Sequence, residues 1–112
     1  MLCLGATRVQ ATVYHVSSSE GDDGHPGSIS QPLASLEALN ALTLQPGDSV
    51  LFKAGDSWNG MFWPKGSGTL ESPIVIDRYG EGARPILDGD GYQAAILLYN
   101  EDHIVLRNLE LT

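Results

Sequence analysis

At Pro46-Gly47-Asp48-Ser49-Val50-Leu51-Phe52-Lys53 the spacing of the apolar residues changes from that of a helix to that of β-strands. Before this stretch, Leu36, Leu39 and Leu42 recur at a helical spacing, and Ser35 stands where an N-cap is expected. After it, only short runs of β-forming residues appear, separated by Gly, Pro, Asn and Asp. The sequence therefore predicts one short amphipathic helix, over residues 36–44, followed by β structure alone.

The spacing of the β runs favours a solenoid over a sandwich. Val50 and Ile74 are 24 residues apart and Ile74 and Ile96 are 22 apart, while Phe62 and Leu87 form a second series. A repeat in the low twenties with at least two strands per period is typical of a coil whose inward residues stack on those of the next coil. The connections are mostly too long for the two-residue hairpins of a sandwich. The runs are Val50–Lys53, Met61–Trp63, Ile74–Asp77, Ile86–Leu87, Ala95–Leu98 and Ile104–Leu106.

The chain divides into three parts by composition. Residues 1–11 are apolar and small, and they are interpreted either as the remnant of a signal peptide or as a disordered terminus. Residues 12–48 hold a short strand, an acidic Ser/Gly/Asp/Pro loop and the helix. Residues 49–112 hold the β runs. A signal peptide would predict a secreted, extracellular or periplasmic location.

Charge and hydropathy exclude several classes of protein. Six Lys and Arg against 14 Asp and Glu give a net charge of −8, which repels nucleic acid. Mean hydropathy is −0.08, and no apolar run approaches the roughly 20 residues of a transmembrane helix. An anionic polysaccharide would also be repelled unless a cation or a local basic cleft intervened.

An ordered set of segments resembles the N-terminal cap and first coils of pectate-lyase-like right-handed parallel β-helix proteins, related to bacterial polysaccharide lyases and glycoside hydrolases. The resemblance implies an all-β solenoid with one short N-terminal capping α-helix, of which this chain is an incomplete fragment. The uncapped C-terminal coil would then expose its apolar ladder and allow self-association. The segments are residues 14–17, 21–27, 31–36, 44–55, 58–60, 67–69, 72–76 and 79–85.

The same resemblance implies a function for the parent protein. It predicts a secreted or cell-surface protein that degrades or binds polysaccharide, with lyase chemistry slightly favoured over hydrolysis, and this chain as its non-catalytic N-terminal part. The alternative is a non-enzymatic β-helix module for adhesion, surface display or structural support. No catalytic motif is identified in the segment, so no catalytic residue is assigned.

Two weak binding sites are considered. Trp58 lies between Ser57 and Asn59 and is a candidate for stacking on a sugar ring, although core packing is the commoner fate of a Trp. Asp22 and Asp23, in the loop Glu20-Gly21-Asp22-Asp23-Gly24, are candidates for binding Ca²⁺. A solvated turn is favoured over a metal loop, because Asp and Gly are the residues that turns select.

Overall fold

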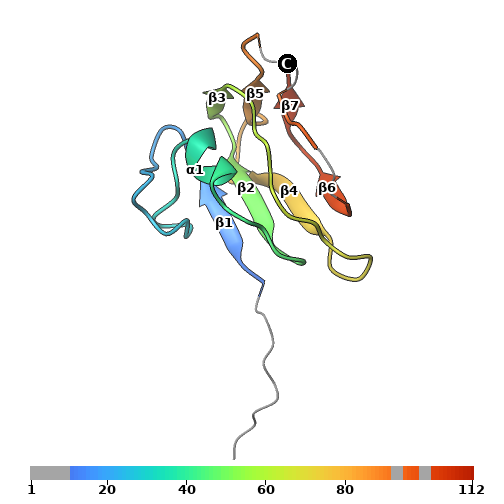
Figure 1. The fold of residues 1–112 in the computed structure, drawn as a ribbon. Coiled ribbons are helices and arrows are strands. Elements are labelled where there is room, and N and C mark those ends of the chain that lie inside the picture. The colour runs from blue at the N-terminus through green and yellow to red at the C-terminus, as the bar shows by residue number, and fades with distance from the viewer. Residues whose placement is uncertain (1–10, 92–94, 99–101) are drawn as a thin grey trace, which may run out of the picture.

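The computed structural model describes residues 11–91, 95–98 and 102–112, and the interpretation of residues 1–11 falls almost wholly outside them. Short strands dominate, and the helix is brief (Figure 1). No helix among the described residues is long and apolar enough to cross a membrane. In chain order the elements are β1 (Val13–Val16), α1 (Leu36–Asn40), β2 (Ser49–Lys53), β3 (Ser57–Asn59), β4 (Ile74–Tyr79), β5 (Ile86–Asp88), β6 (Ile104–Leu106) and β7 (Glu110–Leu111).

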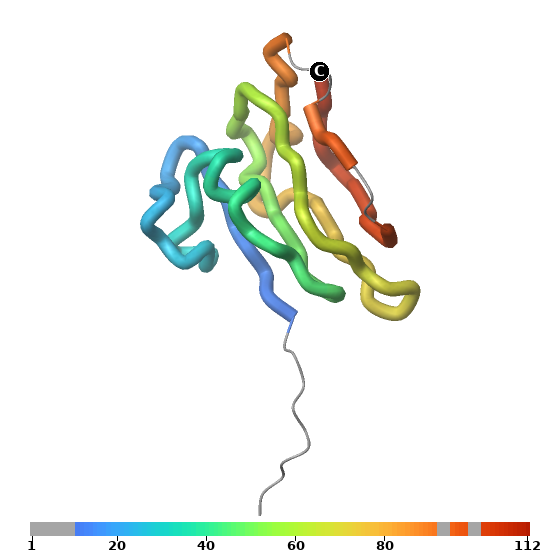
Figure 2. The backbone as a smooth tube through the Cα atoms, in the orientation of Figure 1, coloured from blue at the N-terminus to red at the C-terminus, as the bar shows by residue number. Residues whose placement is uncertain are grey.

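The strands form two sheets, and within each sheet every pair of neighbouring strands is parallel. The first sheet has the order β1-β2-β4-β6 and the second has the order β3-β5-β7. From β2 onward, successive strands alternate between the two sheets, so the chain crosses from one to the other and back (Figure 2). Isolated bridges, including one between Phe62 and Ile96, supplement the sheets.

The core lies between the two sheets, because alternate residues of each strand point inward. In β2 and β4 the pattern is regular: Val50, Phe52, Ile74 and Ile76 are fully buried, while their neighbours are half-exposed. Phe52 contacts the rings of Trp58 and Phe62 edge to face. The buried cluster consists of Val16, Leu33, Leu36, Leu39, Leu44, Val50, Phe52, Trp58, Phe62, Ile74, Ile76 and Leu87.

Helix α1 begins where the sequence predicts and ends earlier. Ser35 is the N-cap, and its side chain accepts a hydrogen bond from the Ala38 amide. Leu36 and Leu39 are buried in the core, and α1 lies beside β1 and β2 (Figure 1). The predicted end at residue 44 is wrong, because Thr43 already forms a bridge with Lys65 and the Leu44 amide donates to the Lys65 carbonyl. The chain leaves the helix in order to make this pairing.

The strand register does not follow the repeat that the sequence predicts. Val50 pairs with Ile76 rather than Ile74, and Ile74 pairs with Ile104 rather than Ile96. Ile96 instead bridges to Phe62. Apolar residues alternate along every run, so a shift of two residues keeps the inward pattern and cannot be detected from hydrophobicity alone.

The prediction of a right-handed parallel β-helix solenoid is therefore corrected. The described residues form separate parallel sheets of four and three strands, with one five-residue helix, and their paired residues are separated by unequal lengths of chain. The division into residues 1–11, 12–48 and 49–112 stays a prediction.

Candidate functional site

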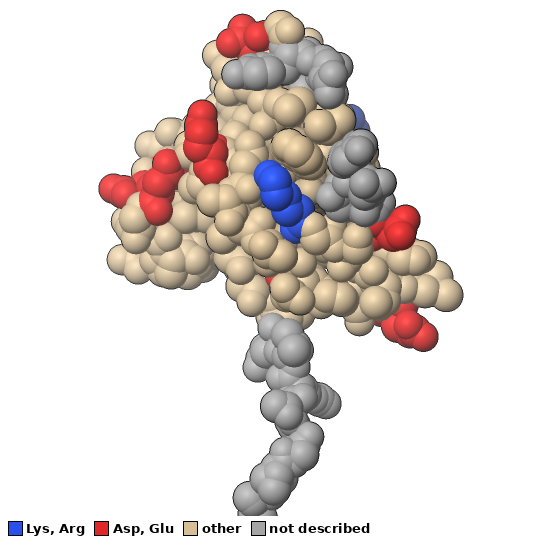
Figure 3. Space-filling model, in the orientation of Figure 1, with Lys and Arg blue, Asp and Glu red and all other residues tan. Residues whose placement is uncertain are grey.

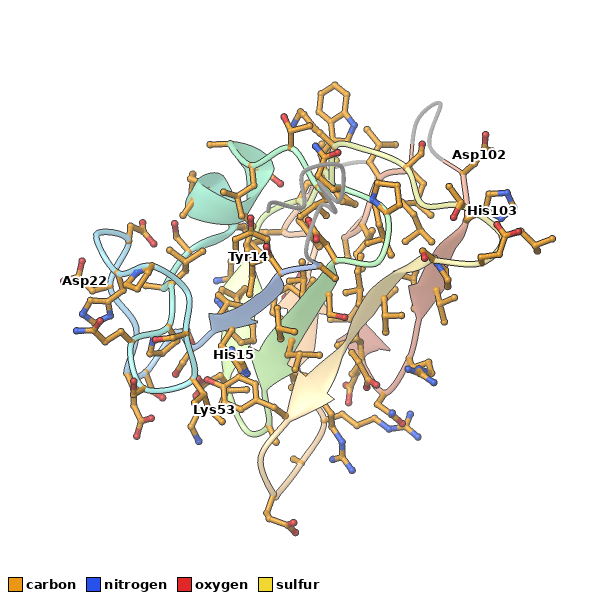
Figure 4. The ribbon with its side chains drawn as sticks, turned by 90° about the horizontal axis from the view of Figure 1, so that it is seen from below. Tyr14, His15, Asp22, Lys53, Asp102 and His103 are labelled. Atoms are coloured by element: carbon orange, nitrogen blue, oxygen red, sulfur yellow. The ribbon has the colours of Figure 1, made fainter. Side chains whose placement is uncertain are left out.

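The outer face of the first sheet carries the main group of polar and aromatic side chains that the fold brings together. His15 of β1, Lys53 of β2, and Asp77 and Tyr79 of β4 all alternate with inward residues, and Asp56 follows β2. These five residues are called the outer-face cluster below. Figure 4 shows His15 and Lys53 on one side of the sheet, with Tyr14 directed to the opposite, α1 side.

Two aromatic rings meet within this cluster. The centroids of the His15 and Tyr79 rings are 4.9 Å apart, and the rings are nearly perpendicular. His15 Nδ1 lies 3.2 Å from the Gly27 carbonyl oxygen, which fixes the ring against the loop. Burial raises the pKa of the Tyr79 hydroxyl, and the charges of Asp56 and Glu20 raise it further. Tyr79 therefore stays neutral and keeps its proton as a hydrogen-bond donor.

Asp56 is held by the loop that follows β1. Its Oδ2 accepts from the Ser17 hydroxyl at 2.6 Å and from the Ser19 amide at 3.3 Å. Burial raises the pKa of the Asp56 carboxyl, but the hydrogen bonds from Ser17 and Ser19 and the Lys53 charge together outweigh it, so the pKa lies below its ordinary value. Asp56 is thus an ionised acceptor.

Asp77 is ionised for a similar reason. Asn108 Nδ2 donates to its Oδ1 at 2.9 Å, and Arg107 Nε lies 3.4 Å from its Oδ2. Burial raises the pKa of the Asp77 carboxyl, whereas the bonds from Asn108 and the Arg78 amide and the charges of Arg107 and Arg78 lower it, with a net decrease. Asn108 adopts a positive φ of 57°, which an Asn tolerates and which belongs to the turn that follows β6.

The protonation states decide what the outer-face cluster can do. Hydrolysis of a glycosidic bond needs one carboxylic acid whose raised pKa keeps its proton, beside a second that is ionised. In Asp56 and Asp77 both pKa values are lowered, so neither carboxyl is tuned to donate a proton. The cluster offers ionised acceptors, an ammonium donor and an aromatic pair, which can bind hydroxyl groups.

A second candidate is an open hollow of about 320 Å³ between α1 and the segment after β3. Asn40 organises it: its side chain donates to the Met61 carbonyl and accepts from the Trp63 amide. Lys65 Nζ lies 4.4 Å from the centre of the Trp63 ring and donates to the Asn40 carbonyl. The polar groups of the hollow are mostly exposed. It is lined by Leu36, Glu37, Asn40, Asn59, Gly60, Met61 and Asp90.

Charge is unevenly distributed around the hollow. Figure 3 shows acidic side chains toward the edges of the face that carries α1, with a basic side chain near its middle. The net charge of −8 makes the molecule a poor receptor for anions and leaves uncharged ligands unaffected.

The structure places Trp58, the sugar-stacking candidate, in the core. Only 5% of its surface is exposed, and its Nε1 donates to the Ala34 carbonyl at 2.9 Å. The ring packs edge to face against Phe52. This position leaves almost no face of the indole ring for a sugar, so packing accounts for Trp58.

Asp22 and Asp23 lie in the surface loop between β1 and α1. Asp22 Oδ1 accepts from the Gly24 amide, and the Asp23 carboxylate accepts from the Ala34 and Ser35 amides and the Ser35 hydroxyl. The bond from the Ser35 hydroxyl lowers the pKa of Asp23. Calcium binding stays a prediction. In the described part of the chain, no group of three or more His, Cys, Asp or Glu is arranged to hold a metal ion.

Sequence reasoning missed the outer-face cluster. His15, Lys53, Asp56 and Asp77 belong to no recognisable motif in the sequence. The available signal was their alternation with buried residues along β2 and β4. That signal places side chains on a face, but only the observed register, Lys53 beside Tyr79 and Leu51 beside Asp77, brings them together.

Comparisons with known proteins were made for the whole chain. No family model matches it. A lacto-N-biosidase of Bifidobacterium longum subsp. longum is 30% identical over 135 aligned positions, covering 95% of this chain and 8% of the relative. Two crystal structures of the GH136 lacto-N-biosidase from Eubacterium ramulus are also similar. The selenomethionine derivative has a TM-score of 0.82 and 35% identity, and the native protein has a TM-score of 0.78 and 34% identity.

The alignments cover most of this chain but only a small part of each similar protein. They include 87% and 88% of this chain, and 19% and 20% of the two crystallised chains. These findings overturn the resemblance to pectate-lyase-like proteins and polysaccharide lyases, and with it the alternative of an adhesion module. The chain is similar in sequence and structure to lacto-N-biosidases, which fits a carbohydrate-active protein.

Proposed function

We propose that this chain is part of a glycoside hydrolase that acts on oligosaccharides, and that the described residues form a non-catalytic section of it. The observation that carries the proposal is the similarity to the GH136 lacto-N-biosidase of Eubacterium ramulus, at 35% identity and a TM-score of 0.82 over 87% of the chain. The lowered pKa values of Asp56 and Asp77 argue against either carboxyl as the proton-donating acid of a hydrolase. The proposal includes secretion, because residues 1–11 are interpreted as the remnant of a signal peptide or as a disordered terminus, and the first of these implies export.

We further propose that an uncharged saccharide lies against the outer-face cluster. Ionised Asp56 and Asp77 would accept hydrogen bonds from sugar hydroxyls, and such charge-assisted bonds are the stronger kind. Lys53 and the Tyr79 hydroxyl would donate to sugar oxygens. The overall negative charge does not oppose an uncharged ligand, whereas it would repel a uronate polymer.

Titration of the purified chain with a lacto-N-biose-containing oligosaccharide, followed by NMR chemical shifts, tests this placement. We expect shifts at His15, Lys53 and Tyr79, and at least about a tenfold loss of affinity in Tyr79→Ala, because stacking and a hydroxyl partner are both removed. Leu70→Ala, at a side chain that is 82% exposed in a loop outside the cluster, is the matched control and should bind normally. Shifts confined to the α1 hollow would refute the outer-face assignment.

A further inference from the structure

Ser17 is a buried polar side chain that reaches the outer-face cluster from the loop after β1. None of its surface is exposed to solvent. Its amide donates to the Leu33 carbonyl oxygen at 2.8 Å, which fixes the backbone of Ser17 beside the segment that leads into α1. Its hydroxyl donates to Asp56 Oδ2 at 2.6 Å, a short bond of the charge-assisted kind, between residues 39 positions apart in the sequence. This bond ties the loop to the turn that follows β2.

The Ser17 hydroxyl is oriented from its other side as well. The Glu20 amide donates to Ser17 Oγ at 3.0 Å. A hydroxyl oxygen accepts through its lone pairs and has one proton to give, so it can accept from Glu20 and donate to Asp56 at once. Since an unsatisfied buried polar group costs free energy, both bonds favour one orientation of the hydroxyl, with its proton directed at Asp56.

The two oxygens of the Asp56 carboxylate have different surroundings. Oδ2 accepts from the Ser17 hydroxyl and the Ser19 amide, whereas Oδ1 forms no hydrogen bond within the part of the chain that the structure describes. The backbone of Asp56 is also held, because its amide donates to the Lys53 carbonyl at 3.2 Å and its carbonyl accepts from the Ile86 amide at 3.1 Å. A residue fixed at its backbone and at one carboxylate oxygen presents the other oxygen in a defined direction.

We propose that Ser17 is a positioning residue of the saccharide site, which holds Oδ2 of Asp56 so that Oδ1 accepts a hydrogen bond from a sugar hydroxyl. This inference rests on the proposed binding of an uncharged saccharide at the outer-face cluster. A carboxylate that is already oriented loses less conformational freedom when a ligand binds, so more of the hydrogen-bond energy appears as affinity. Ser17 acts through Asp56 and does not touch the sugar, because none of its own surface is exposed.

Ser17 also keeps Asp56 in the form that accepts hydrogen bonds. Burial raises the pKa of the Asp56 carboxyl, and the hydrogen bond from Ser17 is the largest of the effects that lower it. Without that bond the pKa should rise, so a saccharide held by Asp56 should be released at a higher pH on acidification. The other titratable side chains on the elements around Asp56 are His15, Glu20, Lys53, Tyr79 and Arg84.

Titration of two alanine variants with a lacto-N-biose-containing oligosaccharide, followed by NMR chemical shifts, tests the proposal. Ser17→Ala should lower the affinity by about three- to tenfold at neutral pH, because the ligand must then order the Asp56 carboxylate itself. The loss should grow as the pH falls. Ser19→Ala is the matched control, since Ser19 reaches Asp56 through its backbone amide, which alanine retains, and its side chain is exposed. This variant should bind like the unmodified chain.

The carboxyl carbon of Asp56 gives a readout that a merely structural role of Ser17 would not move. Its NMR signal should titrate at a higher pH in Ser17→Ala than in the unmodified chain, and at an unchanged pH in Ser19→Ala. If Ser17→Ala fails to fold by circular dichroism, the unmodified chain still decides the matter. Added saccharide should shift the Asp56 carboxyl carbon through Oδ1, while the Ser19 amide keeps its protection from hydrogen exchange because Oδ2 stays bound.

The outcomes separate this inference from the proposed function on which it rests. Binding by the unmodified chain that weakens in Asp56→Asn but not in folded Ser17→Ala would overturn the role of Ser17 and leave the saccharide site standing. An Asp56 carboxyl carbon that does not respond to the saccharide, or a Ser19 amide that loses protection on binding, would overturn the assignment of Oδ1. Absence of binding at the outer-face cluster of the unmodified chain would refute the site itself, and the role of Ser17 with it.

Discussion

At the scale of single residues, Asp48 shows how a buried charge is used for structure. Its side chain belongs to a residue only 2% exposed, and its two carboxylate oxygens accept from the Thr12 and Gln45 amides, each at 2.8 Å. It thereby joins two segments. The turn between α1 and β2 is held against the start of β1.

Replacing Asp48 should therefore destabilise the fold. Asp48→Ala removes the acceptor of the Thr12 and Gln45 amides, whose bonds are partly buried. Since each hydrogen bond contributes about 0.5–1.5 kcal/mol, we expect the free energy of unfolding to fall by about 1–3 kcal/mol. Asp48→Asn retains one acceptor oxygen and should lose less. Urea unfolding measures both variants, and equal losses would contradict the two-acceptor role.

Asp56 should make stability depend on pH. Burial opposes its ionisation, but the bonds from Ser17 and Ser19 and the Lys53 charge give a folded pKa below the ordinary value of 3.8. A depressed folded pKa adds stability that is fully present above the unfolded pKa and is lost as pH falls through the folded one. Asp56→Asn should flatten the stability profile below about pH 4, and Ser17→Ala should flatten it partly. Unfolding curves from pH 6 to pH 2.5 test this, and an unchanged acid limb in Asp56→Asn would refute it.

At the scale of elements, several segments could be predicted and others could not. Ser35 and the apolar spacing behind it located the start of α1, and β-forming runs located β2, β4, β5 and β6. Strand β3 was missed because Trp58 is its only apolar residue, and Ala95–Leu98 contributes only an isolated bridge at Ile96. The partner of Val50 was misjudged by two residues because alternation repeats every two residues. Ile74 was matched to Ile96, which belongs to another segment and bridges to Phe62. The outer-face cluster depends on the observed register of β2 and β4, so sequence patterns alone could not predict it.

The acidic loop tests packing at this scale, because two of its glycines differ sharply. A Cβ atom on Gly21 would collide with the backbone oxygens of Leu33 and Ser17, whereas one on Gly24 would meet only the Asp22 side chain, at 3.2 Å. Gly21→Ala should therefore lower the free energy of unfolding by about 1–3 kcal/mol, and Gly24→Ala should change it little. Thermal melts compare the two, and equal melting temperatures would show that the loop adapts without cost.

At the scale of the whole molecule, similarity to known proteins rather than a motif carries the functional argument. No motif in the sequence identifies the two parallel sheets, the helix over one end or the polar outer face. The similarity to lacto-N-biosidases rests on most of this chain and on at most a fifth of the crystallised chains.

The most direct measurement is release of product from a chromogenic lacto-N-bioside, made in parallel on the purified 112-residue chain and on the product of the complete reading frame that encodes it. We predict hydrolysis by the reading-frame product and none by the 112 residues alone. Hydrolysis by the 112-residue chain would contradict its non-catalytic role. Failure of the folded reading-frame product to hydrolyse this or any related oligosaccharide glycoside would contradict the proposed function itself.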